Sequence, residues 1–145
     1  IDLNNGNFIE LLKEIVLKIS NDEDLVGVPQ NENEASYSIW RDDDDYEIDW
    51  NMPSDKIKRL IDAVGYPYLG ARTSTTKGEK IRVTKAKAVE DVQCELRHVG
   101  KVIFINDGLP TVICGKGLLR INEAYCVDCE GKSYLPMKSF RVKFV

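Results

Sequence analysis

Ile48-Asp49-Trp50 is the first of four motifs that follow one another along the chain. Next come an amphipathic pattern over residues 53–64 and the turn-like stretch Tyr66-Pro67-Tyr68-Leu69-Gly70-Ala71. The fourth motif, Gly115-Lys116-Gly117-Leu118-Leu119-Arg120-Ile121, lies late in the β-like segments that come after them. Apolar residues in the amphipathic pattern stand at i, i+3, i+4 and i+7, and Gly65 follows them; they are Ile57, Leu60, Ile61 and Val64. This spacing predicts a helix with one face in the core. Pro53-Ser54-Asp55 supplies a capping residue and an acid for its first turn.

Beyond Gly70 the period changes from helical to alternating, as in half-buried strands. We predict strands over residues 71–75, 80–89, 92–99, 101–106, 111–114, 118–127 and 133–144. We predict turns at residues 76–79, Gly100, Asp107-Gly108, 115–117 and 128–132. Many strands joined by short turns favour an antiparallel β-barrel, so the fold class is α+β, mainly β.

The order and spacing of these motifs resemble the C-terminal domain of formyltransferases of the methionyl-tRNA formyltransferase type, a family that includes sugar N-formyltransferases. An IDW-like start, a short helix, a PxPGA-like turn and a GxGxLxI-like late strand follow one another in that family. Leu69 stands where the pattern has a second proline. The resemblance covers residues 30–140 and implies an OB-like open antiparallel β-barrel with one internal helix. It also implies that residues 1–52 form an N-terminal helix and acidic connector, and residues 53–145 the barrel domain.

The resemblance further implies that the parent enzyme transfers a formyl group from 10-formyltetrahydrofolate to an amine, that of methionyl-tRNA or of a nucleotide-linked amino sugar. In the family, an Asn, His and Asp constellation on a separate N-terminal domain does this chemistry, and that domain is not in this chain. His98 is the only histidine, and no partner motif accompanies it. We therefore expect a non-catalytic accessory domain that binds no cofactor itself and has the missing catalytic domain as its partner.

Length and composition set limits on the class of protein. A chain of 145 residues with 43% hydrophobic content can bury one core. The longest apolar runs have the length of a strand, and the first residues lack the pattern of a signal peptide. We therefore expect a cytoplasmic protein without a membrane span.

The N-terminal segment has a helical apolar pattern. Phe8, Leu11, Leu12, Ile15 and Ile19 fall on one face, Asn7 and Glu10 resemble a capping box, and residues 21–24 are expected to end the helix. If the family resemblance holds, this helix belongs to the missing domain, and its apolar face could pack on the barrel or pair with another chain as a homodimer. An ordinary helix on the domain's own core is the alternative.

Charge is distributed unevenly along the chain. Residues 1–52 contain 14 acidic and 3 basic residues, a balance of −11, whereas residues 53–145 contain 10 acidic and 17 basic residues, a balance of +7. The basic part could serve an anionic partner while the acidic part forms a linker. Alternatively, the two parts neutralise each other across the fold.

Basic residues are the candidates for acceptor binding: Lys56, Arg59, Arg72, Lys80, Arg82 and Lys85. Positive charge suits a phosphate backbone. Aromatic stacking platforms are scarce, because Phe104 and Tyr125 both stand in apolar contexts that indicate core positions. We therefore expect contacts to a tRNA backbone without readout of its bases.

Metal binding has weak support. Cys126-Val127-Asp128-Cys129 resembles half a zinc knuckle, but Cys94 and Cys114 stand twenty positions apart, so free thiols are expected. The run Asp42-Asp43-Asp44-Asp45 could hold a cation or contact an amine, although a solvated charge run is the commoner explanation. We expect no metal and no catalytic residue.

Three functions remain open. The first is the accessory barrel of a formyltransferase, for which the acidic connector favours a small acceptor and the basic barrel favours tRNA. The second is an independent OB-like nucleic-acid-binding module. The third is a dimerisation or scaffold domain.

Overall fold

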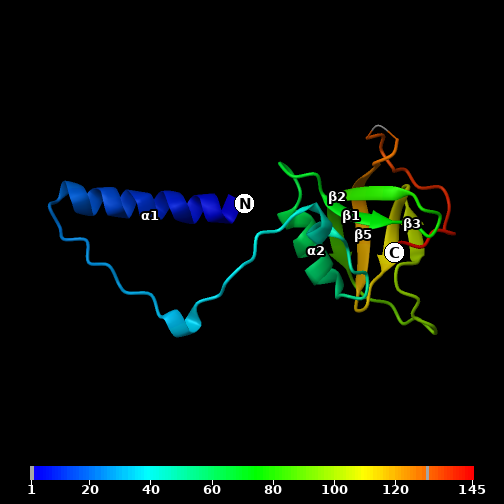
Figure 1. Cartoon of the computed structure of the whole chain (residues 1–145), viewed down its shortest axis with the longest axis horizontal. Helices are drawn as coiled ribbons and strands as arrows, with labels where there is room; N and C mark the ends of the chain where they lie inside the picture. Colours follow the sequence, from blue (N-terminus) through cyan, green and yellow to red (C-terminus); the bar gives the residue numbers. More distant parts are fainter. Residues whose placement is uncertain (1, 130) are drawn as a thin grey trace. The chain divides into compact units, whose positions relative to one another are not determined.

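The computed structural model describes residues 2–129 and 131–145, and the chain divides into two compact units, Ile1–Ile39 and Trp40–Val145 (Figure 1). The first unit consists of α1 (Asp2–Ser20) and a loop with the short 3₁₀ helix η1 (Glu32–Glu34). The helix ends where predicted, but it begins before the predicted start at Asn7. All five apolar side chains of the predicted stripe are exposed.

The second unit is built on a five-stranded antiparallel sheet in the order β1-β2-β5-β4-β3. The strands are β1 (Ala71–Ser74), β2 (Lys80–Val89), β3 (Val102–Asn106), β4 (Leu109–Ile113) and β5 (Leu118–Cys126). Asp107 and Gly108, at the predicted turn between β3 and β4, have φ of 52° and 77°, as a tight hairpin requires. The predicted turn at 128–132 includes residue 130, which lies outside the described residues.

Two predicted strands are wrong. Residues 92–99 form a loop, which Asp91 and Arg97 tie to the Gly115–Gly117 turn through side-chain bonds. Residues 133–144 form only isolated bridges, although their alternation resembles a strand. The antiparallel sheet and the two α-helices confirm the prediction of a mainly β, α+β fold. Among the described residues the five strands form an open sheet, and the OB-like barrel stays a prediction.

The last residues hydrogen-bond to both edges of the open sheet. The amide of Val145 donates to the carbonyl of Ser74 in β1 (2.8 Å), and the amide of Phe144 donates to the carbonyl of Gly100, just before β3 (2.8 Å). Phe144 is 1% exposed and packs its ring against Trp50, with 5.4 Å between centroids. Backbone pairing and one aromatic anchor therefore hold the C-terminal segment across the gap between the edge strands.

Helix α2 (Ser54–Ala63) packs mainly against β2, as Figure 1 shows. Ile57, Ile61 and Val64 of the predicted stripe are buried, and Leu60 is partly buried against the same core. The prediction of a capping side chain is wrong: Pro53 is the N-cap and no side chain caps the helix. Instead, the amide of Ser54 donates to the carbonyl of Lys116 (2.9 Å).

The motifs that are far apart in the sequence meet in space. The amide of Gly115 donates to the carbonyl of Trp50 (2.9 Å), and Pro53 forms a bridge with Lys116. The indole N–H of Trp50 donates to the hydroxyl of Thr73 (2.9 Å), which in turn donates to the carbonyl of Val145 (3.1 Å). The IDW start, the first strand and the glycine turn thus form one junction, in which Trp50 and Thr73 are buried.

Candidate functional site

Two arginines lie side by side on the first two strands. Arg72 of β1 and Arg82 of β2 are direct cross-strand partners, and Ser74 and Lys80 pair two residues further along. Like charges placed opposite each other in a sheet destabilise it unless anions neutralise them. The side chain of Arg82 is only 10% exposed, so its charge requires partners within the protein.

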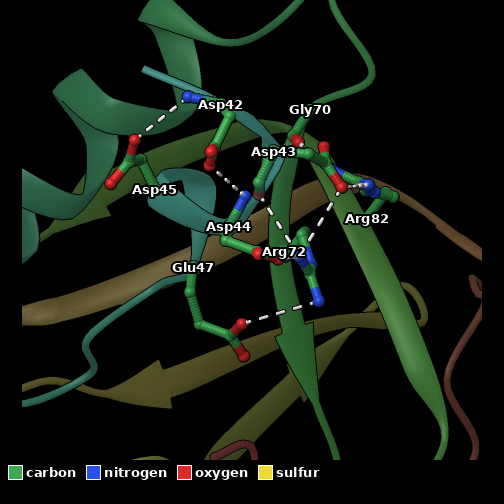
Figure 2. A network of polar contacts seen from close by, with 8 residues as sticks. All are labelled: Asp42, Asp43, Asp44, Asp45, Glu47, Gly70, Arg72 and Arg82. Carbon is green, nitrogen blue, oxygen red and sulfur yellow. Dashed lines mark hydrogen bonds and ion pairs between the residues drawn. The ribbon is translucent and has the colours of Figure 1, made fainter. Parts of the chain in front are cut away.

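The acidic run of residues 42–45 supplies these partners (Figure 2). The 3₁₀ helix η2 (Asp43–Tyr46) begins with a capping arrangement in which the carboxylate of Asp42 accepts from the amide of Asp44 (3.1 Å) and the carboxylate of Asp45 accepts from the amide of Asp42 (3.0 Å). This turn presents Asp43 to Arg82 at 2.6 Å and Asp44 to Arg72 at 2.6 Å. Part of the aspartate run therefore neutralises the arginine pair, in agreement with the alternative that the two oppositely charged parts neutralise each other.

The charges shift the pKa values of the groups in the network. The hydrogen bond from Arg82 holds the pKa of Asp43 below its ordinary value, and the hydrogen bond to Asp44 raises the pKa of Arg72. Arg82 also donates to the carbonyl of Gly70 (3.1 Å), which anchors the guanidinium to the PxPGA-like turn. A shallow cavity of about 300 Å³ adjoins the network and is lined also by Lys80.

We expect acid to release the connector from the sheet. Because the pKa of Asp43 is lower in the folded state, its ion pair stabilises the fold above the carboxyl pKa of the unfolded chain, about 3.9, and this contribution is lost as pH falls through the folded-state pKa. The amide of Ile48, which donates to the carbonyl of Arg72 (2.8 Å), should then exchange faster with solvent. Hydrogen exchange at pH 6 and pH 3, corrected for intrinsic rates, measures this. Unchanged protection of Ile48 would contradict it.

The six predicted acceptor-binding residues do not form one patch. Arg72, Lys80 and Arg82 line the cavity, whereas Lys56 and Arg59 lie on α2. Arg59 pairs with Asp55 (3.1 Å) and Lys85 with Glu123 (2.7 Å). Among the described residues, Lys56 and Lys80 form no ion pair. These two lysines are therefore the most available of the six for an outside anion.

The histidine and the four cysteines are the other reactive side chains considered in the sequence. His98 is exposed on a loop, where residues 92–99 were predicted to form a strand. All four cysteines are free thiols, and burial raises the pKa of Cys114 to about 12. Within the described ranges, no group of three or more His, Cys, Asp or Glu side chains could hold a metal ion.

No helix in the same residues combines the length and apolar character needed to cross a bilayer.

A second cross-strand cation pair was not predicted from the sequence. Lys87 of β2 lies opposite Arg120 of β5, and Arg120 lies opposite Thr111 of β4. The prediction that Phe104 is a core residue is wrong, because its side chain is 43% exposed at the position opposite Thr111. Alternation along single strands could have indicated that these residues share a face, but the register that makes them neighbours depends on long-range pairing.

Comparison with known proteins gives consistent results. The relatives include the methionyl-tRNA formyltransferase of Marinobacter nauticus, 38% identical over 111 residues, and that of Alkaliphilus oremlandii, 28% identical over 134 residues. These alignments cover 76% and 92% of this chain but only 34% and 40% of those proteins. A solved structure of a HypX variant from Aquifex aeolicus has a similar fold, with a TM-score of 0.56 and 17% identity over 83% of this chain and 20% of that one.

The family match extends over most of the second unit. Residues 41–143 match the family described as the C-terminal domain of formyl transferases. This range contains the acidic η2 turn, α2, the whole sheet and the C-terminal residues up to Lys143. The resemblance inferred from the motifs is confirmed, and the chain belongs to the formyl transferase C-terminal domain family.

Proposed function

We propose that this chain is the non-catalytic C-terminal part of an enzyme that transfers a formyl group from 10-formyltetrahydrofolate to an amine, and that its second unit binds the acceptor. The catalytic Asn, His and Asp constellation and the folate site would belong to a separate N-terminal domain. The match of residues 41–143 to the family carries the first part of this proposal. The partial coverage of both relatives is consistent with it.

The acceptor that we favour is methionyl-tRNA. Both relatives described above are methionyl-tRNA formyltransferases. Residues 53–145 have a balance of +7, and the acids of the connector that opposed this assignment are partly engaged by Arg72 and Arg82. The remaining basic surface suits a phosphate backbone, because phosphate neutralisation dominates the affinity for nucleic acids. We assign Lys56 and Lys80 to this contact.

A homodimer is the second candidate function, and α1 supports it. Its exposed apolar side chains cover a wide face, with Phe8 64%, Leu11 59% and Ile19 58% exposed. Contiguous apolar surface of this kind usually marks an interface. Analytical ultracentrifugation of the chain would test this alternative, since a monomer at all concentrations would contradict it.

The experiment that tests acceptor binding compares two ligands across a salt series. We expect the chain to bind bulk tRNA with an affinity that falls steeply with salt, and to bind a nucleotide-linked amino sugar weakly or not at all. Filter binding for tRNA and calorimetry for the sugar would measure these affinities. Tight binding of the sugar with no binding of tRNA would reverse the choice of acceptor, and no binding of either would leave α1-mediated assembly as the function.

Charge variants make the comparison specific. The double variant Lys56→Gln/Lys80→Gln should weaken tRNA binding and reduce the slope of log affinity against log salt by about 1 to 2, since each phosphate contact contributes about 0.7 to 0.9. Lys18→Gln is the matched control for each single variant, Lys56→Gln or Lys80→Gln, because it removes one charge and Lys18 already pairs with Glu14 on α1 (2.7 Å). An equal loss in the control would show that only net charge matters.

A further inference from the structure

One row of side chains crosses four strands of the sheet. Lys87 (β2), Arg120 (β5), Thr111 (β4) and Phe104 (β3) are successive cross-strand partners. Directly opposed residues in an antiparallel sheet point to the same face, so these four side chains are neighbours on one surface. Leu119, one residue from Arg120, lies in the core on the other face. We call these four residues the cationic row.

The positive end of the cationic row lacks the neutralisation that the first cation pair has. Arg72 and Arg82 have Asp43 and Asp44 within 2.6 Å of their guanidinium groups. Within the part of the chain that the structure describes, Lys87 and Arg120 form no ion pair, and the Nε of Arg120 is buried without a hydrogen-bond partner. Two adjacent cations and an unsatisfied buried donor are both costly, and an anion that accepts hydrogen bonds would relieve both costs.

The chemistry of the row matches a phosphate group. A guanidinium binds phosphate through two parallel hydrogen bonds, and an ammonium adds a second positive charge. Thr111, only 4% exposed, offers a hydroxyl next to Arg120 on the same row. All three side chains can donate to an anion.

The other end of the row carries an aromatic ring. Phe104 is 43% exposed, which is unusual for a large apolar residue in the middle of a strand whose neighbour Val102 is 8% exposed. Neighbouring strands lie about 4.8 Å apart, so Phe104 stands about 10 Å from Arg120, two strands away. That separation is suited to a nucleotide whose phosphate lies between Lys87 and Arg120 and whose base stacks on the ring.

We propose that the cationic row is a binding site for an unpaired nucleotide of RNA. Arg120 and Lys87 hold the phosphate, Thr111 donates a hydrogen bond to it, and Phe104 stacks against the base. This inference rests on the proposed function, because its ligand is an unpaired stretch of the tRNA that the proposed function names as the acceptor substrate. It adds base stacking to the backbone contacts expected from charge alone.

The test uses the full chain and a short single-stranded oligoadenylate labelled with fluorescein, together with an abasic strand of equal length. Fluorescence anisotropy should show that Arg120→Gln and Lys87→Gln weaken binding of both strands by roughly tenfold and lower the salt slope by about 0.7 each. Phe104→Leu should weaken binding of the oligoadenylate by roughly tenfold and leave the abasic strand unaffected. Arg120→Lys should recover part of the loss, because it restores charge without the two-pronged geometry.

Controls separate binding from folding. Lys138→Gln removes a positive charge from an exposed loop of the same unit and should have no more than a twofold effect on either strand. Thermal unfolding of each variant checks the fold, and Lys87 is exposed, so Lys87→Gln remains a test if Arg120→Gln does not fold.

Different failures have different meanings. If the wild-type chain does not bind the oligoadenylate, or if Phe104→Leu weakens both strands equally, the site proposal is overturned. If the row variants bind like wild type while tRNA still binds in a salt-dependent manner, the site proposal fails and the proposed function stands. Absence of tRNA binding with intact, base-dependent binding of the oligoadenylate would support the row and overturn the choice of acceptor.

Discussion

Gly115→Ala is expected to destabilise the second unit by about 3 kcal/mol or more, the upper end of the range for overpacked sites. An added Cβ would lie 1.8 Å from the backbone oxygen of Asn51 and 2.6 Å from its carbonyl carbon. Both distances are far below a van der Waals contact. Gly115 has no side chain because the backbone of the IDW segment occupies the place that a side chain would take.

Neither segment can move away without breaking bonds. The amide of Gly115 donates to the carbonyls of Trp50 (2.9 Å) and Met52 (3.2 Å), and the neighbouring carbonyl of Lys116 accepts from Ser54 at the start of α2. Separating the two segments by enough to admit a methyl group would break these backbone hydrogen bonds. The clash therefore cannot be relieved by a local shift.

Urea unfolding followed by far-UV circular dichroism measures the effect. Gly78→Ala is the matched control, because Gly78 has φ of +85° but nothing within 4 Å of an added Cβ. The control should lose only the cost of a left-handed alanine, about 1 kcal/mol. Equal losses in the two variants would show that the junction is looser than the hydrogen bonds indicate.

Local patterns were sufficient to predict much of the fold. The apolar spacing over 53–64 predicted α2. Alternation predicted β2 over its full length and the other four strands to within a few residues. The two wrong strands have a common reason. Residues 92–99 and 133–144 alternate in sequence, but they are attached by side-chain bonds or single bridges rather than by a continuous ladder. Alternation of apolar and polar residues indicates which side chains are exposed, but it does not indicate whether another strand pairs with the backbone.

The candidate sites were harder to predict, because register decides which charges are neighbours. The sequence places Arg72 and Arg82 ten positions apart, and only the β1–β2 pairing brings them together. Lys87 and Arg120 are more than thirty positions apart and meet through the β2–β5 register, which contains irregularities between Val83 and Ala86. A shift of one residue would move each side chain to the other face.

The acidic run shows how a charge pattern can have a structural use. Four consecutive aspartates were interpreted as a solvated run or a site for a cation or amine. Instead, two of them cap η2 and the other two contact arginines. These aspartates neutralise the pair Arg72 and Arg82 within the chain. Among the described residues no acid pairs with Lys87 or Arg120, and this difference is the reason to propose an outside anion for the second pair.

Phe144→Ala is expected to cost about 3 to 5 kcal/mol, the usual cost of truncating a buried phenylalanine. Phe144 is 1% exposed and packs on Trp50 and Tyr134, with 5.4 Å and 6.4 Å between ring centroids. Its amide donates to the carbonyl of Gly100, just before β3, while the next residue bonds Ser74 of β1. The ring is thus the only deeply buried side chain of the segment that spans the two sheet edges, residues 142–145, within the described residues.

The measurement is urea unfolding followed by tryptophan fluorescence in a Trp40→Phe background, since Trp40 is 95% exposed and Trp50 is 3% exposed. The emission of Trp50 should shift to the red at a lower urea concentration in Phe144→Ala. Val145→Ala is the control: its side chain is 50% exposed and its backbone bonds to Ser74 are retained, so it should cost less than about 1 kcal/mol. If Phe144→Ala cost no more than Val145→Ala, the C-terminal segment would be held by its backbone bonds alone, and the gap between β1 and β3 would not depend on an aromatic anchor.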